Sequence, residues 1–71
     1  MNRQVAENIC RMVEAILAQM QSFNNYAIEN CERAHLERIV SAMALCVTEL
    51  DIEILEPIHR QYPDLKPPFL P

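Results

Sequence analysis

The chain has 71 residues, 51% of them hydrophobic, and a net charge of −4. Its size limits it to one domain with little interior, because a chain this short buries only about 60% of the surface of its unfolded form. The acidic balance disfavours nucleic-acid binding, and there is neither a membrane-spanning apolar run nor a signal-peptide core, so we expect a cytoplasmic protein that binds neither nucleic acid nor membranes.

The distribution of glycine and proline predicts the fold class. The sequence contains no glycine, and its five prolines all fall within the last fifteen positions. Helix interiors exclude both residue types, glycine for its backbone entropy and proline because it lacks an amide hydrogen and clashes with the preceding turn. We therefore expect an all-α protein, with a helical hairpin over residues 1–62 and an extended proline-rich tail over residues 63–71.

The first predicted helix covers residues 2–21. Its apolar residues recur at steps of three and four, which is typical of one buried stripe on an amphipathic helix. Charged residues occupy the other side, where Glu7 precedes Arg11 in the favourable i,i+4 order. The apolar stripe comprises Val5, Ile9, Met12, Val13, Ile16, Leu17 and Met20.

Residues 22–25 are the least helical stretch before the first proline, and we expect a tight turn there. Ser22, Asn24 and Asn25 all favour the position just before a helix, because their side chains accept hydrogen bonds from its first amides. The alternative is one continuous helix through residue 55, which would be about 80 Å long at 1.5 Å per residue.

The second predicted helix covers residues 26–55 and is apolar on two sides. One stripe comprises Leu36, Ile39, Val40, Met43, Val47, Leu50 and Ile54, and the other comprises Ala27, Cys31, Ala34, Ala42, Leu45 and Ile52. A helix that is apolar on two sides is buried on two sides, and the first helix can cover only one of them. We therefore expect an antiparallel hairpin that dimerises into a four-helix bundle, with the second stripe as the partner interface.

The prolines define the end of the second helix. Pro57 is predicted to end it, because the residue before a proline avoids the helical region, and to open a short turn over residues 57–62. In the tail, Leu65, Phe69 and Leu70 are apolar enough to pack on the bundle. The alternative for this segment is a polyproline-type ligand for another domain.

Glu29, Glu32 and His35 are the candidate metal ligands. Glu32 and His35 have the E-x-x-H spacing that di-iron carboxylate bundles use. The competing interpretation is a solvated helix start, whose carboxylates the helix dipole stabilises. We favour the second interpretation and expect no metal and no cofactor, because Glu14, the acid at the corresponding height of the first helix, points away from its apolar stripe.

Cys10, Cys31 and Cys46 are predicted to be reduced thiols, since Cys31 and Cys46 lie too far apart on one helix to be bridged and no C-x₂₋₄-C pair suggests zinc. A bare helix pair offers no oxyanion donors beside a nucleophile, so we assign no catalytic residues and expect no enzyme. The favoured function is a homodimeric protein–protein interaction module. The alternatives are an acidic chaperone, antitoxin or inhibitor that covers its apolar face with a different protein, and a metal-binding carboxylate bundle.

Overall fold

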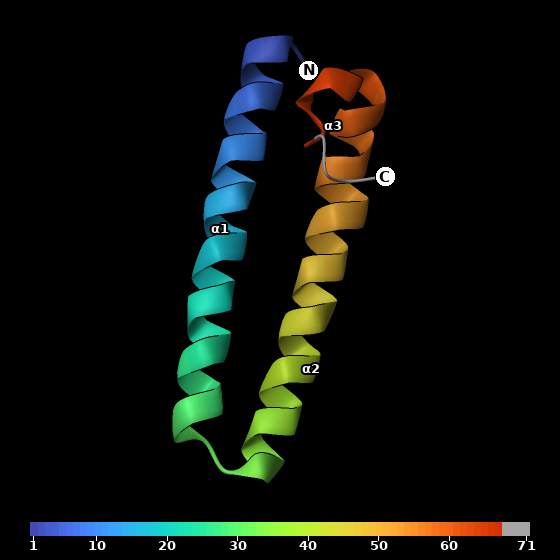
Figure 1. Cartoon of the computed structure of the whole chain (residues 1–71). Coiled ribbons are helices and arrows are strands. Elements are labelled where there is room, and N and C mark those ends of the chain that lie inside the picture. The colour runs from blue at the N-terminus through green and yellow to red at the C-terminus, as the bar shows by residue number, and fades with distance from the viewer. Residues whose placement is uncertain (68–71) are drawn as a thin grey trace.

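Two long antiparallel helices joined by a short turn dominate the computed structural model (Figure 1), which describes residues 1–67. The molecule measures 44 × 22 × 16 Å. The all-α hairpin is confirmed, and the described residues contain no strand. In chain order the elements are α1 (Arg3–Asn30), α2 (Arg33–Leu50), the π-helical turn η1 (Asp51–Leu55), α3 (Glu56–Gln61) and the 3-10 turn η2 (Pro63–Leu65).

The turn between the long helices lies at Cys31 and Glu32. Both residues have extended backbone, with φ/ψ of −103°/147° at Cys31 and −68°/155° at Glu32. The prediction of a turn at residues 22–25 is therefore wrong, and so is the alternative of a continuous helix through residue 55. Serine and asparagine cost a helix less than about 0.7 kcal/mol each. Continuing the helix through them brings Ala27 to a buried position, where it is 2% exposed.

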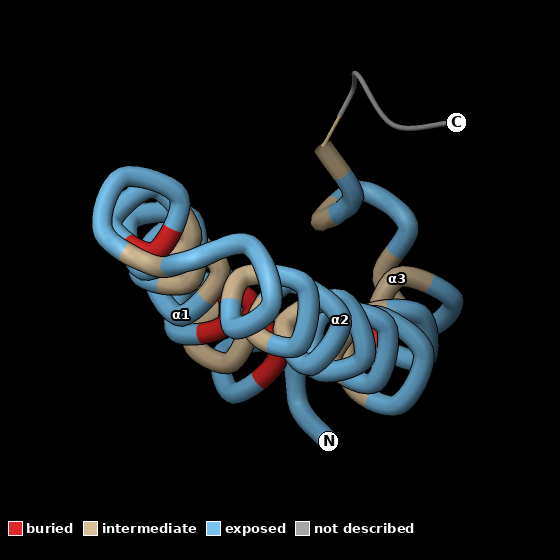
Figure 2. Tube along the Cα trace, turned by 90° about the horizontal axis from the view of Figure 1, so that it is seen from below, coloured by how far each residue is buried: buried red, intermediate tan, exposed pale blue. Residues whose placement is uncertain are grey.

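The inner face of α1 follows a heptad pattern, in which steps of four and three residues alternate. Its buried and half-buried members are Ala6, Cys10, Val13, Leu17, Met20, Asn24 and Ala27. This face is offset from the predicted stripe, so that Val5, Met12 and Ile16 are exposed instead of buried. Figure 2 shows short buried segments along α1, whereas α2 contains no buried residue.

The π-helical turn η1 keeps the inner face of the second arm continuous beyond α2. On α2 the half-buried residues of this face are Leu36, Ile39, Met43 and Leu50. A heptad continued from Leu50 would place Glu53 and Pro57 inside. The extra residue in the turn rotates the chain, so that Ile54 and Ile58 take those places instead. Ile58 is 3% exposed, whereas Glu53 and Pro57 are exposed.

Pro57 lies within the helical path and does not end it. α3 contains the proline in its first turn and continues to Gln61, and Glu56 before it keeps right-handed helical angles. The proline follows the π-helical turn, in which the amide of Glu56 donates to the carbonyl of Asp51 five residues earlier, so the regular i→i−4 hydrogen bonds are already interrupted where the proline lacks its amide hydrogen. The predicted turn over residues 57–62 is thus mainly a short helix.

The open end of the hairpin is closed by α3 and η2, which fold back against the start of α1. Ala6, Cys10 and Ile58 form a buried cluster there, and Tyr62 and Leu65 pack against it. This cluster joins the two ends of the chain, so the segment after α2 completes the protomer's small core.

The proline-rich tail begins differently from the prediction. Pro63–Leu65 is a 3-10 turn and not extended chain. Leu65 packs on the helical body, as expected for the apolar residues of this segment. Phe69 and Leu70 lie outside the described residues.

Candidate interaction surface

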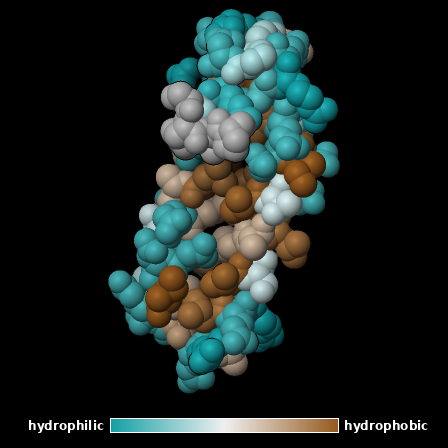
Figure 3. Space-filling model, turned by 45° about the vertical axis from the view of Figure 1, so that its right-hand side comes forward, coloured by the Kyte–Doolittle hydropathy of each residue, from teal (hydrophilic) through white to brown (hydrophobic). Residues whose placement is uncertain are grey.

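The protomer exposes more surface than a compact chain of its mass. Its accessible surface is 5455 Å², whereas a compact monomer of 8.2 kDa exposes about 4,500 Å². Two helices side by side form a single layer, so each buries only the side that faces the other. Figure 3 shows apolar side chains gathered in a band along the hairpin, with hydrophilic side chains at both ends.

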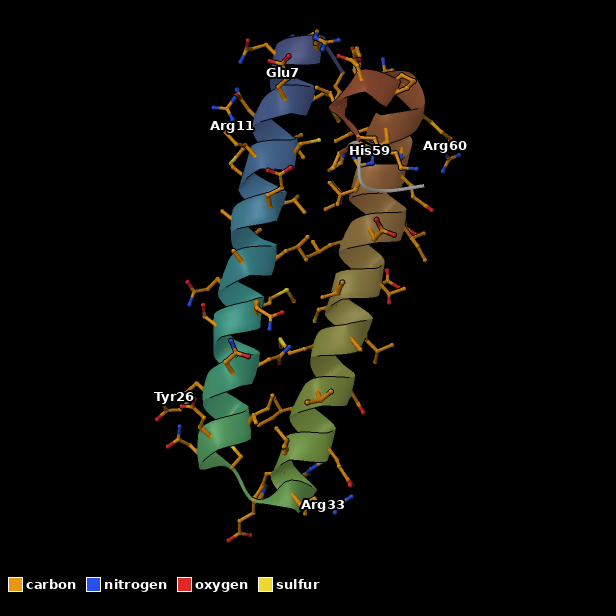
Figure 4. All side chains as sticks on the ribbon, in the orientation of Figure 1. Glu7, Arg11, Tyr26, Arg33, His59 and Arg60 are labelled. Carbon is orange, nitrogen blue, oxygen red and sulfur yellow. The ribbon has the colours of Figure 1, made fainter. Side chains whose placement is uncertain are left out.

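One row of apolar side chains flanks the inner face of α1. We name Ile9, Ile16 and Phe23, which recur every seven residues, the α1 row. Ile16 is 47% exposed and Phe23 is 46% exposed, while Ile9 is half-buried. Met12 and Tyr26 extend this apolar surface outward, and Figure 4 shows Tyr26 pointing away from α2.

The row on the opposite flank of α1 is polar. It contains Glu7, Glu14 and Gln21, which also recur every seven residues, and only its last member, Ile28, is apolar and exposed. The two flanks of α1 therefore differ in character, and only one of them continues the apolar surface of the inner face.

An exposed stripe runs along α2 and into η1 at steps of three and four residues. We name it the α2 stripe, and it comprises His35, Arg38, Ala42, Leu45, Glu49 and Ile52. Leu45 is 69% exposed and Ile52 is 47% exposed. The stripe is basic near the turn, apolar in its middle and acidic toward η1. Such a graded stripe has the apolar centre and charged ends that characterise protein interfaces.

Surface hollows show that the α1 row and the α2 stripe lie on the same side of the hairpin. A hollow of about 470 Å³ is lined by Leu45, Cys46, Glu49, Leu50, Glu53 and Ile54. A second hollow, of about 350 Å³, shares Glu53 and Ile54 with it and is also lined by Ile9. Ile9 of the α1 row and Leu45 and Glu49 of the α2 stripe therefore border two hollows that adjoin at Glu53 and Ile54.

A third hollow lies closer to the turn between the long helices. It has a volume of about 330 Å³ and is lined by His35, Arg38, Ile39 and Ala42, which lie on the same side of α2 as Leu45. We name the side of the hairpin that carries the α1 row, the α2 stripe and these three hollows the grooved face. It extends along most of α2.

Asn24 is a polar residue among the otherwise apolar side chains on the inner face of α1. Its Oδ1 atom is enclosed and has no hydrogen-bond partner in the described structure. Enclosed polar atoms are normally hydrogen-bonded, because an unpaired one costs about 1–3 kcal/mol. Asparagine at such a heptad position also restricts which helix arrangements are stable.

The predicted partner-interface residues divide into three groups. Ala27 lies in α1 and is 2% exposed, so its assignment to an outer interface is wrong; the cause is the misplaced turn. Cys31 is half-buried in the observed turn. Ala34, Ala42 and Leu45 lie on α2, Ile52 lies in η1, and all four are exposed.

Sequence reasoning missed the contribution of α1 and of the charged residues. Ile16 was assigned to the buried stripe, and Phe23 to a turn. Arg38 and Glu49 were not singled out, although they share the spacing of Ala42 and Leu45. The available signal was the seven-residue recurrence of Ile9, Ile16 and Phe23 beside the heptad of the inner face.

The candidate metal ligands are not brought together. Glu29 is in the last turn of α1, Glu32 is in the turn with extended backbone, and His35 is in the first turn of α2. The break at Glu32 removes the continuous helix that the E-x-x-H interpretation required. Within residues 1–67, no group of three or more histidine, cysteine or acidic side chains is placed to hold a metal ion.

The three cysteines are free thiols in different environments. Cys10 is buried, Cys31 is half-buried and Cys46 is exposed. Burial raises the pKa of the Cys10 thiol, and the charge of Glu14 raises it further. Cys46 lines the hollow of about 470 Å³ beside Leu45 and Glu49, so its accessibility reports on that face.

A set of polar contacts ties the first residues to the end of the described chain. The guanidinium of Arg3 donates from Nη1 to Asp64 Oδ1 at 3.2 Å and from Nη2 to Oδ2. It also lies over the ring of Tyr62, 5.8 Å from the centroid, while the hydroxyl of Tyr62 donates to the carbonyl of Met1 at 2.8 Å. The hydrogen bond from Arg3 lowers the pKa of Asp64.

Comparison with protein-family models, curated proteins and solved structures finds no match. Among the described residues, no helix has the length and apolar character needed to cross a membrane.

Proposed function

We propose that the protein is a small non-enzymatic interaction module that works as a homodimer, in which two hairpins pack into a four-helix bundle. The observation that carries this proposal is the grooved face, where the α1 row and the apolar middle of the α2 stripe are exposed side by side. Burial of such a face is favourable because it removes apolar surface from water.

The amount of exposed surface supports a dimer of ordinary size. The protomer's 5455 Å² exceeds the surface of a compact monomer by roughly 900 Å². Each partner in a standard protein interface buries about 800 Å². One interface with a second hairpin therefore suffices to bring the protein to the compactness expected for its mass.

The proposal is tested by sedimentation velocity of the full chain over a wide range of concentration. We expect a dimer that dissociates on dilution, and a urea-unfolding midpoint that rises with protein concentration, because association stabilises the folded state. A chain that stays monomeric at every concentration would exclude the homodimer.

A matched pair of variants locates the interface on α2. Leu45→Asp places a charge in the α2 stripe, whereas Val47→Asp places the same charge two residues away, on the other edge of the helix, where Val47 is 39% exposed. We expect Leu45→Asp to abolish the dimer and Val47→Asp to retain it. Equal loss of association in both variants would argue against the grooved face.

The second candidate is a chaperone, antitoxin or inhibitor that covers the same face with a different protein. It is favoured by the small core, since the buried residues within positions 1–67 are Ala6, Cys10, Val13, Ala27 and Ile58. A core of this size leaves a lone protomer marginal. This candidate predicts a monomer that binds hydrophobic dyes and aggregates when it is purified alone.

We also propose a cytoplasmic location, because three free thiols suit a reducing compartment.

A further inference from the structure

The α2 stripe is symmetric about a point between Met43 and Ala44. Ala42 and Leu45 are equally distant from this point, and so are Arg38 and Glu49. The first pair joins a small and a large apolar side chain and the second joins a base and an acid, whereas the outermost pair, His35 and Ile52, is not complementary. Two copies of α2 that run antiparallel and share this midpoint bring each residue opposite its counterpart.

The apolar centre of the stripe fits this arrangement in size. Leu45 is the most exposed large apolar residue of the described chain, at 69%, and Ala42 is small. In the antiparallel pairing, the leucine of one copy faces the alanine of the other, as a knob faces a hole in helix packing. This contact occurs twice, because a two-fold interface uses the same patch on both protomers.

The charges of the stripe fit the same pairing. Within the part of the chain that the structure describes, neither Arg38 nor Glu49 forms an ion pair. The antiparallel arrangement places Arg38 of each copy opposite Glu49 of the other. A parallel arrangement would instead place like charges together and is disfavoured.

Two members of the α1 row, Ile16 and Phe23, are arranged about the same centre, whereas Ile9 lies outside this pair. Ile16 and Phe23 are equally distant from a point between Gln19 and Met20. This point lies twelve residues before the middle of the Cys31–Glu32 turn, and the midpoint of the α2 stripe lies twelve residues after it. Because both helices rise about 1.5 Å per residue, the two points lie at the same height in the hairpin.

We propose, as a refinement of the homodimer, that a second copy packs on the grooved face about a two-fold axis at this height, perpendicular to the long helices. α1 then lies antiparallel to α1 of the second copy, with Ile16 opposite its Phe23. α2 lies antiparallel to α2 of the second copy, with Arg38 opposite its Glu49. A single two-fold axis generates both the α1–α1 pairing and the α2–α2 pairing. The result is a four-helix bundle in which both protomers use the same surface.

The opposite edge of the hairpin also carries a hollow, of about 520 Å³ and lined by Arg33, Leu36, Glu37, Val40 and Ser41, but the flank of α1 on that side is mainly polar. Val40 and Val47 are also symmetric about the midpoint of α2 and are exposed. The α1 residues on that flank are Glu7, Glu14, Gln21 and Ile28, so a second copy there would remove the carboxylates of Glu7 and Glu14 from water, which is costly unless they are paired. On the grooved face, α1 presents Ile16 and Phe23 and the middle of α2 presents Ala42 and Leu45, so both helices offer apolar side chains. We therefore place the second copy on the grooved face.

Charge reversal tests the proposed register in the full-length chain. Arg38→Glu alone and Glu49→Arg alone each create two like-charge contacts per dimer, and we expect each to weaken association by about tenfold at low salt. A mixture of the two variants restores both contacts, since each chain then carries the charge that the other lacks. We expect the mixture to form a heterodimer with wild-type affinity, measured by sedimentation and by native mass spectrometry.

Control variants separate local pairing from net charge. Arg60→Glu and Glu29→Arg make the same changes of charge at exposed positions outside the stripe, and Figure 4 shows Arg60 pointing away from the hairpin. We expect both to associate like the wild type. If the wild type dimerises but the mixture of Arg38→Glu and Glu49→Arg is no tighter than either variant alone, the register is wrong while the homodimer stands. If the wild type is monomeric, both proposals fail.

Discussion

Arg3 in the first turn of α1 and Asp64 in η2 are 61 residues apart in sequence and form a two-pronged ion pair. Arg3 also donates from Nε to Glu7 Oε1 at 3.1 Å, so its guanidinium is held between two carboxylates. The pair fixes η2 against the start of α1, over the cluster that contains Ala6 and Ile58. It thereby links the end of the described chain to the region with the best-packed core.

This ion pair predicts an acid-sensitive component of stability. The hydrogen bond from Arg3 lowers the pKa of Asp64 in the folded protein from its usual 3.8. A lowered carboxyl pKa contributes stability above the unfolded-state value and loses it as the pH falls through the folded-state value. We expect Asp64→Asn to lower the melting temperature modestly at neutral pH, because the pair is solvent-exposed.

The comparison is made by following melting temperature with pH for the wild type and for Asp64→Asn. The difference between them is expected to shrink as the pH falls below about 4. Glu29→Gln serves as the control, since Glu29 has no ion-pair partner in the described structure. A difference that persists unchanged in acid would show that Asp64 acts through packing and not through its charge.

The hairpin was predictable because its determinants are local. The absence of glycine and proline before Pro57 predicts helix wherever apolar residues recur at steps of three and four. The position of the turn was not predictable in this way. Ser22, Asn24 and Asn25 have the side chains of a helix cap, yet the gain from burying Ala27 on the inner face outweighs the small helix propensity penalty of these residues.

Of the grooved face, only the part on the second arm of the hairpin was predictable, because its apolar spacing is local. Leu45 and Ile52 follow an apolar spacing that does not depend on where the turn lies. The α1 row could not be separated from the inner face by spacing alone, because Ile16 and Leu17 are adjacent and differ only in which side of the heptad they occupy. The π-helical turn places Ile54, and not Glu53, on the inner face. It depends on contacts at the open end of the hairpin, so no pattern in the neighbouring sequence predicts it.

Ala27→Leu tests whether the inner face continues to the observed turn. Ala27 is 2% exposed, so three extra carbon atoms have no space there, and we expect a loss of about 1–3 kcal/mol in the free energy of unfolding. Ala18→Leu is the control, because Ala18 is exposed on the outer side of the same helix. Urea unfolding measures both variants. Equal stability of the two would favour a turn before residue 27.

Asn24→Leu is expected to stabilise the protomer. The variant removes an enclosed oxygen that lacks a hydrogen-bond partner and replaces it with apolar atoms, which we expect to raise the free energy of unfolding by about 1 kcal/mol or more. Asn25→Leu is the control, since Asn25 is exposed and its Oδ1 accepts from Gln21 Nε2 at 3.3 Å. A variant at residue 24 that unfolds more easily than the wild type would indicate that this oxygen is satisfied in solution.

The three thiols are expected to react with an alkylating reagent in the order of their exposure. Cys46 reacts first, Cys31 next and Cys10 last, because Cys10 is buried and its raised pKa leaves less of the reactive thiolate. Mass spectrometry of peptides after timed alkylation measures the order, and unfolding in urea should remove it. Fast reaction of Cys10 in the native protein would mean that α3 and η2 do not hold the open end closed.

The same reaction reports on association, because Cys46 lies on the grooved face and Cys10 does not. If a second hairpin covers the grooved face, alkylation of Cys46 slows as the protein concentration rises, while the rate at Cys31 in the turn changes less. The Leu45→Asp variant supplies the control, since it is expected to keep Cys46 reactive at every concentration. Protection of Cys46 that is independent of concentration in the wild type would point to shielding within one protomer, and the grooved face would then not be the interface.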